Sequence, residues 1–289
     1  MDYRIKKNYP IIELPKGYEE EKRVKCTPCS TCNQLVLASE TGSNSWENDV
    51  KGVYIKKGLA SDIVTFTMED CDGNVLTNLG QSVTFPHDNL AVGFIYEWQQ
   101  ILNTYGSKCY TIKANFNIAG VTGDYTIGKY DLKPYSIESA RRTVRVFSEF
   151  NSYYLKDKID FTDSNFKDSV RFGGYFGNRQ PKTEINNLIN KGRKVEKVTR
   201  ENLNVYELRT YPLNICITRQ LLDFHFLNED KILISDHNST NHDYLLLDKD
   251  VVLEDSADVN YRDGSRLADI TANFGDREKL SKSFYNKNK

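Results

Sequence analysis

Three cysteines lie within seven residues near the N-terminus, in the stretch CTPCSTC of residues 26–32. They are Cys26, Cys29 and Cys32. Their C-x2-C-x2-C spacing is the one with which an iron–sulfur binding run begins, but that run requires a fourth cysteine followed by proline. Val36 occupies the position of that fourth cysteine, so the sequence does not predict an iron–sulfur cluster.

The same three cysteines could instead contribute to a zinc site or to redox chemistry. A structural zinc site needs four ligands, and the fourth could come from a neighbouring subunit or from one of the other three cysteines. These are Cys71, Cys109 and Cys216. The C-x-x-C spacing within the cluster is typical of redox motifs, but no thioredoxin-like βαβ pattern surrounds it. Thiols that only contribute packing are the simplest interpretation.

The N-terminal sequence MDYRIKKNYP lacks the apolar segment and the cleavage site of a secretory signal peptide. We therefore expect synthesis in a reducing cytoplasm, where cysteines are thiols or metal ligands and not disulfides. The longest apolar run, LAVGFIY at residues 90–96, is much too short to span a bilayer. The sequence therefore predicts no membrane segment.

A second candidate site is the stretch SDHNSTNHD of residues 235–243, which contains two histidines and two aspartates. His237 and His242 are of a residue type that, beside carboxylates, binds metals or transfers protons. They would form the centre of a metal-dependent hydrolase. The stretch also lies between two expected strands and consists of turn-forming residues, which explains it without any chemistry. Only two other histidines occur in the chain, so a histidine-rich site is difficult to assemble.

Other motifs for catalysis or phosphate binding are missing from the sequence. RFGGYFGNRQP, residues 171–181, is glycine-rich but lacks the Gly-Lys-Ser/Thr ending of a phosphate-binding loop, and we expect a tight aromatic loop there. DCDGN, residues 70–74, does not have EF-hand spacing and is expected to be a turn. A G-x-S-x-G nucleophile motif is absent. We therefore predict a protein that is not an enzyme and that has no cofactor, with zinc as the one alternative.

Two oppositely charged segments are the strongest feature of the charge pattern. The whole chain is nearly neutral, with 39 basic and 40 acidic residues, which does not favour general nucleic-acid binding. Residues 191–200 carry five cations and one anion, a net charge of +4, and residues 248–258 carry five anions and one cation, a net charge of −4. The cations are Lys191, Arg193, Lys194, Lys197 and Arg200, and the anions are Asp248, Asp250, Glu254, Asp255 and Asp258. They are either two solvated strand faces or complementary patches on adjacent subunits.

The periodicity of apolar residues indicates a mainly β (α+β) protein of antiparallel sheets, arranged as β-sandwich or barrel domains with two or so short helices. Helices are expected at residues 93–106 and 218–228, and a hairpin around Lys191-Gly192. KILISD, DYLLLD, VVLED and LADITANF are expected to be short meander strands. We predict an extended N-terminal arm with the cysteine cluster at 1–48, a first β-rich domain at 49–136 and a second at 137–289.

Several long stretches together resemble virion structural proteins of tailed phages that infect Bacteroidetes, the crAss-like phages in particular. In the second half they are DSVRFGGYFGNRQP, VYELRTYPLNICITRQLLDFHFLNEDKILISDHN and LADITANFGDREKLSKSFYN. In the first half they are NDVKGVYIKKG, DGNVLTNL and YEWQQILNTYGSKCYTIKANF. The resemblance covers most of the chain and depends on this overall run of features, not on an invariant catalytic motif.

The resemblance implies a β-rich, non-enzymatic subunit of a multi-copy ring or collar in the neck or tail of the virion, through which DNA passes. Its implied partners are copies of itself and other neck or tail proteins, without specific nucleic-acid binding. A lumen that DNA traverses should not bind it tightly, which agrees with the near-zero net charge. The alternative is a metal-dependent hydrolase or a zinc-binding protein that uses the cysteine cluster or the two histidines of residues 235–243.

Overall fold

The computed structural model describes residues 3–6, 11–14, 34–76, 79–118, 121–154, 157–189, 195–227, 230–238, 246–262, 267–277 and 280–282. Over these residues the protein is mostly β-strand with short helices, and nearly all neighbouring strands are antiparallel. This confirms the fold class predicted from the sequence. No helix in the described ranges is both long and apolar enough to cross a bilayer.

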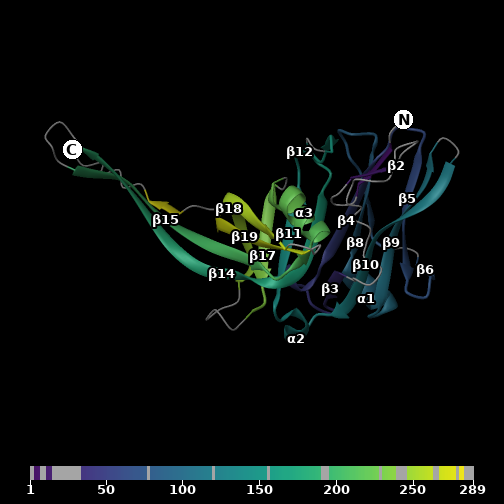
Figure 1. The fold of residues 1–289 in the computed structure, drawn as a ribbon, viewed down its shortest axis with the longest axis horizontal. Coiled ribbons are helices and arrows are strands. Elements are labelled where there is room, and N and C mark those ends of the chain that lie inside the picture. Colours follow the sequence, from purple (N-terminus) through teal and green to yellow (C-terminus); the bar gives the residue numbers. More distant parts are fainter. Residues whose placement is uncertain are drawn as a thin grey trace.

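The first half of the chain forms a sandwich of two five-stranded sheets (Figure 1). The sheet with the order β2-β1-β4-β8-β7 consists of β1 (Tyr3–Lys6), β2 (Ile11–Leu14), β4 (Val50–Lys56), β7 (Gln81–Val83) and β8 (Ala91–Glu97). The sheet with the order β3-β10-β9-β5-β6 consists of β3 (Gln34–Ala38), β5 (Ile63–Asp70), β6 (Val75–Leu76), β9 (Cys109–Ile118) and β10 (Val121–Pro134). Apolar side chains from both sheets share one core.

Helix α1 (Trp98–Tyr105) follows directly on β8 and packs Trp98 and Ile101 into this core, both fully buried. The helix predicted for residues 93–106 is therefore correct in its second part and wrong in its first. Residues 91–97 form a strand instead because they pair with β4 on one side and β7 on the other. Gly106 ends the helix at a φ of 82°, in the left-handed region that glycine adopts without strain.

The second half of the chain forms a closed barrel of six antiparallel strands. They are β11 (Thr143–Phe150), β14 (Phe166–Ile189), β15 (Val195–Thr210), β17 (Lys231–Asp236), β18 (Leu246–Tyr261) and β19 (Leu267–Asp276). The order around the barrel is β11-β14-β15-β19-β18-β17, and the pairing of β17 with β11 closes it. Closure leaves none of these six strands with an unpaired edge inside the barrel wall.

Shorter elements complete the two halves. They are the 3-10 turn η1 (Ser45–Glu47), α2 (Ile137–Ala140), β12 (Tyr153–Tyr154), β13 (Ile159–Asp160), β16 (Leu213–Asn214), α3 (Ile215–Gln220), the π-helical turn η2 (Leu221–Phe226) and β20 (Leu280–Lys282). α3 and η2 together correspond to the helix predicted for residues 218–228. Their Leu221 and Phe226 pack into the barrel core.

Two predictions for the barrel strands are wrong. The glycine-rich stretch of residues 171–181 is not a loop but the middle of the 24-residue strand β14. A Cβ on Gly174 would lie 2.6 Å from the carbonyl oxygen of Arg209, so glycine here allows close contact with β15 and not a turn. DYLLLD and VVLED, expected to be separate strands, contribute to one continuous strand, β18.

Strands β14 and β15 continue beyond the barrel as a two-stranded hairpin (Figure 1). The pairing of β15 with β19 ends at Val205, whereas β14 and β15 stay paired from Gln180–Val205 to Ile189–Val195. We call this part, residues 180–189 and 195–205, the arm. At about 3.3 Å per residue its strands span roughly 30 Å. Within the described residues β20 alone adds a third strand, along residues 200–202.

The sandwich and the barrel share a third, aromatic core. Tyr54 and Phe85 come from the sandwich, and Phe150, Phe166 and Phe224 come from the barrel. The boundary proposed after residue 136 lies between β10 and β11, and β3, within the proposed N-terminal arm, pairs with β10 of the sandwich.

Candidate functional site

The two charged segments lie on different parts of the barrel half. Lys197 and Arg200 are on β15 within the arm, in register with Asn187 and Ile185 of β14. Lys191, Arg193 and Lys194 lie outside the described residues. The acidic segment belongs to β18, which is part of the barrel wall. The described part of the cationic segment, on the arm, is therefore separated from β18 along the long axis of the molecule (Figure 1).

Part of the acidic segment is already neutralised inside the chain. Asp248 accepts hydrogen bonds from Arg145 Nη1 at 3.2 Å and from Ser235 Oγ at 3.0 Å. Asp250 pairs with Arg277 Nε at 2.7 Å. Glu254 and Asp258 are exposed and make no ion pair with the described part of the chain. Asp255 lies on the same strand, and its side chain is not among those that the structure describes. A contact between subunits would therefore depend on Glu254 and Asp258 more than on Asp248 or Asp250.

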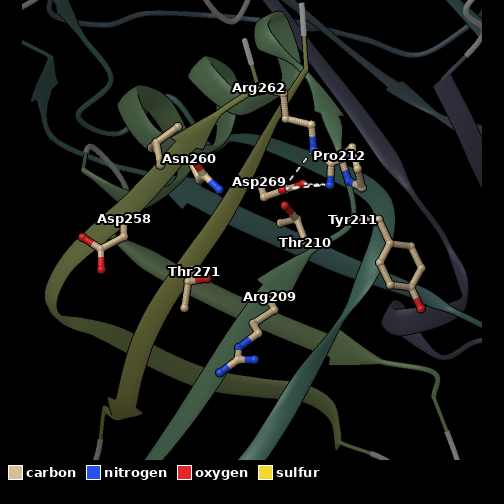
Figure 2. A pocket seen from close by; sticks show the side chains of 10 residues that line it. Arg209, Thr210, Tyr211, Pro212, Asp258, Asn260, Arg262, Asp269 and Thr271 are labelled. Atoms are coloured by element: carbon tan, nitrogen blue, oxygen red, sulfur yellow. Dashed lines mark hydrogen bonds and ion pairs between the residues drawn. The ribbon is translucent and has the colours of Figure 1, made fainter. Parts of the chain in front are cut away.

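A shallow hollow opens on the outer barrel face beside this acidic strand (Figure 2). Its lining comes from β15, β18 and β19 and from residues that directly follow β15 and β18, at the barrel end away from the arm. Two arginines line it, and each has a carboxylate partner: Arg209 with Glu207, and Arg262 with Asp269. No pattern in the sequence indicated this hollow, because its residues come from three strands that only the barrel topology brings together.

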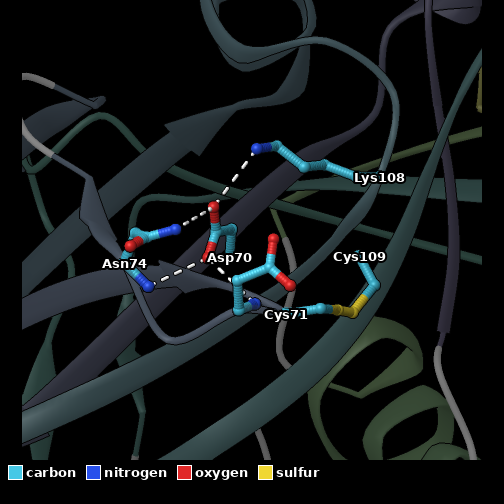
Figure 3. Close-up of a disulfide and its surroundings, with 6 residues drawn as sticks. Asp70, Cys71, Asn74, Lys108 and Cys109 are labelled. Atoms are coloured by element: carbon cyan, nitrogen blue, oxygen red, sulfur yellow. Dashed lines mark hydrogen bonds and ion pairs between the residues drawn. A yellow bond between two sulfur atoms is a disulfide. The ribbon is translucent and has the colours of Figure 1, made fainter.

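The cysteines do not follow the expectation of free thiols. Cys71 and Cys109 form a disulfide that ties the β5–β6 turn to the start of β9, with their Cα atoms 5.5 Å apart (Figure 3). Cys216 is also disulfide-bonded. The expectation that these cysteines stay reduced is therefore wrong, and none of the three is a thiolate that could complete a zinc site. Cys26, Cys29 and Cys32 lie outside the described residues.

Asp70 organises the turn next to this disulfide (Figure 3). Its carboxylate accepts hydrogen bonds from the backbone N–H of Asn74 at 2.9 Å, from the Asn74 side chain at 3.0 Å and from Lys108 Nζ at 3.2 Å. The hydrogen bonds from Asn74 lower the pKa of Asp70 to about 2, and those from Lys108 and Asp72 act in the same direction. The stretch DCDGN is thus a turn, as predicted.

His237 is buried and does not have the setting of a catalytic base. Its Nδ1 lies 3.4 Å from the hydroxyl of Tyr135, and its ring packs beside those of Tyr135 and Trp46. Burial, together with the charges of Arg171 and Arg145, lowers its pKa to about 3, so the ring is neutral at pH 7 and a weak proton acceptor. His242 lies outside the described residues. Among those described, no three His, Cys, Asp or Glu side chains converge as a metal site.

Buried charges concentrate where the sandwich meets the barrel. Asp49, which immediately precedes β4, accepts hydrogen bonds from Arg145 Nε at 3.1 Å and from Arg171 Nε at 2.8 Å and Nη2 at 3.0 Å. Arg145 and Arg171 come from β11 and β14 of the barrel. All three side chains are almost completely buried. Charged hydrogen bonds of this kind join the two halves with defined geometry.

A second buried ion pair involves Lys51 of β4, two residues after Asp49. Lys51 Nζ is 3.0 Å from both carboxylate oxygens of Asp168 on β14. The same carboxylate accepts hydrogen bonds from the backbone N–H of Gly52 at 3.0 Å and from Gln220 Nε2 at 3.1 Å. Burial opposes the charge on Asp168, but Lys51 and the neighbouring His225 outweigh it and keep the pKa of Asp168 below its usual range.

Ser148, His225 and Asp168 are arranged like a Ser–His–Asp triad. Ser148 Oγ lies 2.9 Å from His225 Nδ1, and His225 Nε2 lies 3.3 Å from Asp168 Oδ2, at ion-pair distance but not aligned for a hydrogen bond. All three residues are 0% exposed, so no substrate reaches the serine hydroxyl. The three side chains therefore form a buried polar cluster within the core, and we assign this cluster no nucleophilic role.

The contact between β4 and β14 brings together two of the stretches that carry the resemblance, NDVKG and DSVRFGG. Ser169 Oγ bonds to both the N–H and the carbonyl of Val50, each at 2.8 Å. Gly52 is required by close approach, because a Cβ there would lie 2.4 Å from the carbonyl oxygen of Lys167. The charged residues in these stretches are thus explained by the join between the two halves of the molecule.

No protein-family model matches the chain, and a search of curated protein sequences finds no significant match. The function must therefore be inferred from the projecting arm, the charged surfaces and the buried position of the polar groups.

Proposed function

We propose that this chain is a non-enzymatic structural subunit of a tailed-phage virion that assembles with copies of itself into a ring in the neck or tail, around the path of the DNA. The observation that carries the proposal is the arm, which extends from a closed and well-packed barrel (Figure 1). The resemblance to crAss-like phage virion proteins supplies the virion context.

The arm is long for a structure with so little support. An isolated two-stranded hairpin is only marginally stable in water, and independent stability needs a third strand or a packed face. In the part of the chain that the structure describes, β20 provides a third strand along residues 200–202 only. Burial against a neighbouring molecule would stabilise the rest of the arm, and its open strand edges suit such contact.

Charge gives the contact a direction. Residues 191–200 have a net charge of +4, and the two of their cations that the structure describes, Lys197 and Arg200, lie on the arm. The exposed carboxylates Glu254 and Asp258 lie on the barrel. Contact between different surfaces of identical subunits is heterologous, and it closes into a ring when its rotation divides the full circle. Opposite charges on these two surfaces favour the head-to-tail arrangement and disfavour contact between two arms.

The hydrolase alternative has less support. His237 is buried with a lowered pKa, and the triad-like group at Ser148 is inaccessible. The zinc alternative depends on Cys26, Cys29 and Cys32, for which Cys71, Cys109 and Cys216 offer no thiolate. Elemental analysis of protein prepared without chelator tests it directly, and one zinc per chain would revive it.

Shortening the arm tests the assembly proposal. Ile185 and Arg200 are opposite each other in the hairpin, so Asn-Gly can replace residues 186–199 while the pairing of β20 with residues 200–202 is kept. We expect the full chain to form closed rings in native mass spectrometry and negative-stain images, and the shortened chain to remain monomeric with an unchanged melting temperature. A shortened chain that still forms rings would contradict the role of the arm.

A charge exchange tests the proposed direction of contact. Lys194→Glu with Lys197→Glu should impair ring formation, and adding Glu254→Lys with Asp258→Lys in the same chain should restore it. Lys133→Glu with Arg141→Glu, two exposed cations outside both segments, serves as the matched control and should leave assembly unchanged. Failure of the exchange to restore rings would place the contact of the arm elsewhere.

A further inference from the structure

The hollow on the outer barrel face is large enough for a small molecule and has a mostly polar lining (Figure 2). Its volume is about 490 Å³, within the range of roughly 300–1,000 Å³ that ligand pockets occupy. None of its lining residues belongs to the buried ion pairs that join sandwich and barrel, and it includes only one residue of the acidic segment, Asp258.

Strand register places the polar side chains of the hollow in two rows. Asp258 of β18 and Arg209 of β15 are both in register with Thr271 of β19, which lies between them. Asn260 and Asp269 form the next row. These residues alternate along their strands with buried core residues, so all of them face outward, and directly paired residues lie about 5 Å apart.

Differences in side-chain size create the depression. Thr271 is short and lies in the middle, and Thr210 beside it is buried. Larger side chains surround them at the rim, where Tyr211 remains 48% exposed (Figure 2). An exposed aromatic ring at the edge of a polar hollow provides a flat apolar surface for stacking.

Hydrogen-bonding groups in the hollow are available to a ligand. The side chains of Asp258, Asn260 and Thr271 make no hydrogen bond or ion pair with any residue that the structure describes. They supply a carboxylate acceptor, an amide that both donates and accepts, and a hydroxyl that does the same. A ligand that carries several hydroxyl groups can satisfy all three kinds of partner.

The charges of the hollow argue against an anionic ligand. Arg262 donates to Asp269 at 3.0 Å and Arg209 to Glu207 at 2.6 Å, so neither cation is unpaired. With Asp258 the group has two cations and three carboxylates, a net charge of −1. Phosphate and nucleic acids are bound by unpaired arginines and lysines, and an apolar ligand would need a more apolar lining.

We propose that the hollow formed by β15, β18 and β19 binds a neutral carbohydrate, whose hydroxyl groups bond to Asp258, Asn260 and Thr271 and whose apolar ring face stacks on Tyr211. This proposal does not depend on ring formation, but both proposals use Asp258, so an arm that contacts this carboxylate would compete with the carbohydrate for it. It gives the outer barrel face a second role, in contact with a glycan.

Binding to an array of neutral oligosaccharides, built from hexoses and N-acetylhexosamines, tests the proposal with the full-length chain. Sulfated and phosphorylated oligosaccharides of the same size are printed beside them. We expect millimolar or tighter binding of at least one neutral glycan, measured by saturation-transfer difference NMR. Tyr211→Ala should weaken it roughly fivefold to tenfold, since aromatic contacts contribute about 1 kcal/mol. Thr271→Tyr should abolish it by filling the hollow.

Matched controls separate the site from general effects on the barrel. Tyr153→Ala removes an equally exposed tyrosine elsewhere, and Val252→Tyr adds a tyrosine on an exposed part of β18, so both should bind as the wild type does. If Thr271→Tyr does not fold, Asn260→Ala replaces it. The proposal is overturned if no neutral glycan binds, if only charged glycans bind, or if filling the hollow leaves binding unchanged. Loss of oligomers in Thr271→Tyr without any glycan binding would instead identify a second copy of the chain as the occupant.

Discussion

Lys51 and Asp168, 117 residues apart in the sequence, form a bidentate ion pair 3.0 Å long at the centre of the contact between sandwich and barrel. Each side chain is at most 5% exposed. A buried pair of this kind contributes less to net stability than its short distance suggests, because both ions lose their hydration. Removing one ion has a much larger effect, since the other is left buried without its counter-charge.

We therefore predict that Lys51→Met lowers the free energy of unfolding by about 3–5 kcal/mol. Adding Asp168→Asn should recover a large part of that loss, because the amide is neutral and still accepts the bond from Gly52 N–H. Urea denaturation of the two single variants and the double variant measures the coupling. Lys133→Met, which removes an exposed pair with Asp131, should cost less than about 1 kcal/mol. Equal losses in Lys51→Met and the double variant would contradict this account.

The fold class was predictable from the sequence because alternation and turn residues are local signals. Alternating stretches such as CYTIKANFNI and DYTIGKYDL were correctly predicted as paired strands β9 and β10. The predicted start of the first helix was wrong, because Phe94 lies on β8, whose pairing with β4 and β7 is a long-range interaction. Local periodicity gives no information on such partners.

The interface chemistry was not predictable for the same reason. Asp49, Lys51, Asp168 and Arg171 have the charged character of a solvated strand face, and only their meeting across two halves of the chain allows their burial. Likewise, Asp248 was predicted as a candidate for contact between subunits, but β18 places it beside Arg145.

The prediction that the cysteines are not disulfides was wrong, because Cys71 and Cys109 are 38 residues apart and only the pairing of β5 with β9 brings them together.

Acid should destabilise the protein before its carboxylates titrate. The pKa of His237 is about 3 in the folded chain against an ordinary value of 6.5, so the unfolded chain binds the proton more readily. The contribution of His237 to the free energy of unfolding is therefore fully present above pH 6.5 and decreases as the pH falls. At pH 5 the free energy of unfolding is lower by about 2 kcal/mol. His225, whose pKa is also lowered by burial, acts in the same direction. Urea denaturation between pH 7.5 and 5 measures the slope, and His237→Gln should reduce it; an unchanged slope would contradict the assignment.

Gly52 should be among the least replaceable glycines. Gly52→Ala places a Cβ 2.4 Å from the Lys167 carbonyl oxygen and 2.6 Å from the Phe166 ring, so β4 and β14 must separate. We expect a loss of about 3 kcal/mol or more, comparable with other overpacked core positions. Gly73→Ala is the control, because it has open space but a φ of 85°, and should cost only about 1 kcal/mol. Thermal and urea denaturation rank the two variants, and the reverse order would show that the β4–β14 contact is looser than described.

The disulfide between Cys71 and Cys109, which joins the β5–β6 turn to the start of β9, should stabilise the sandwich. It closes a loop with a sequence separation of 38, for which the chain-entropy relation gives about 4 kcal/mol as an upper figure. The pairing of β5 with β9 already restricts the same loop in any residual structure, so we expect the double variant Cys71→Ser/Cys109→Ser to lose about 2–4 kcal/mol. Substitution tests this bond more clearly than a reductant, which would also reduce the disulfide of Cys216. Non-reducing peptide mapping should first recover the Cys71–Cys109 cross-link from protein that has been exposed to air. Free thiols at both positions, or a double variant as stable as the wild type, would show that the two cysteines only pack against each other.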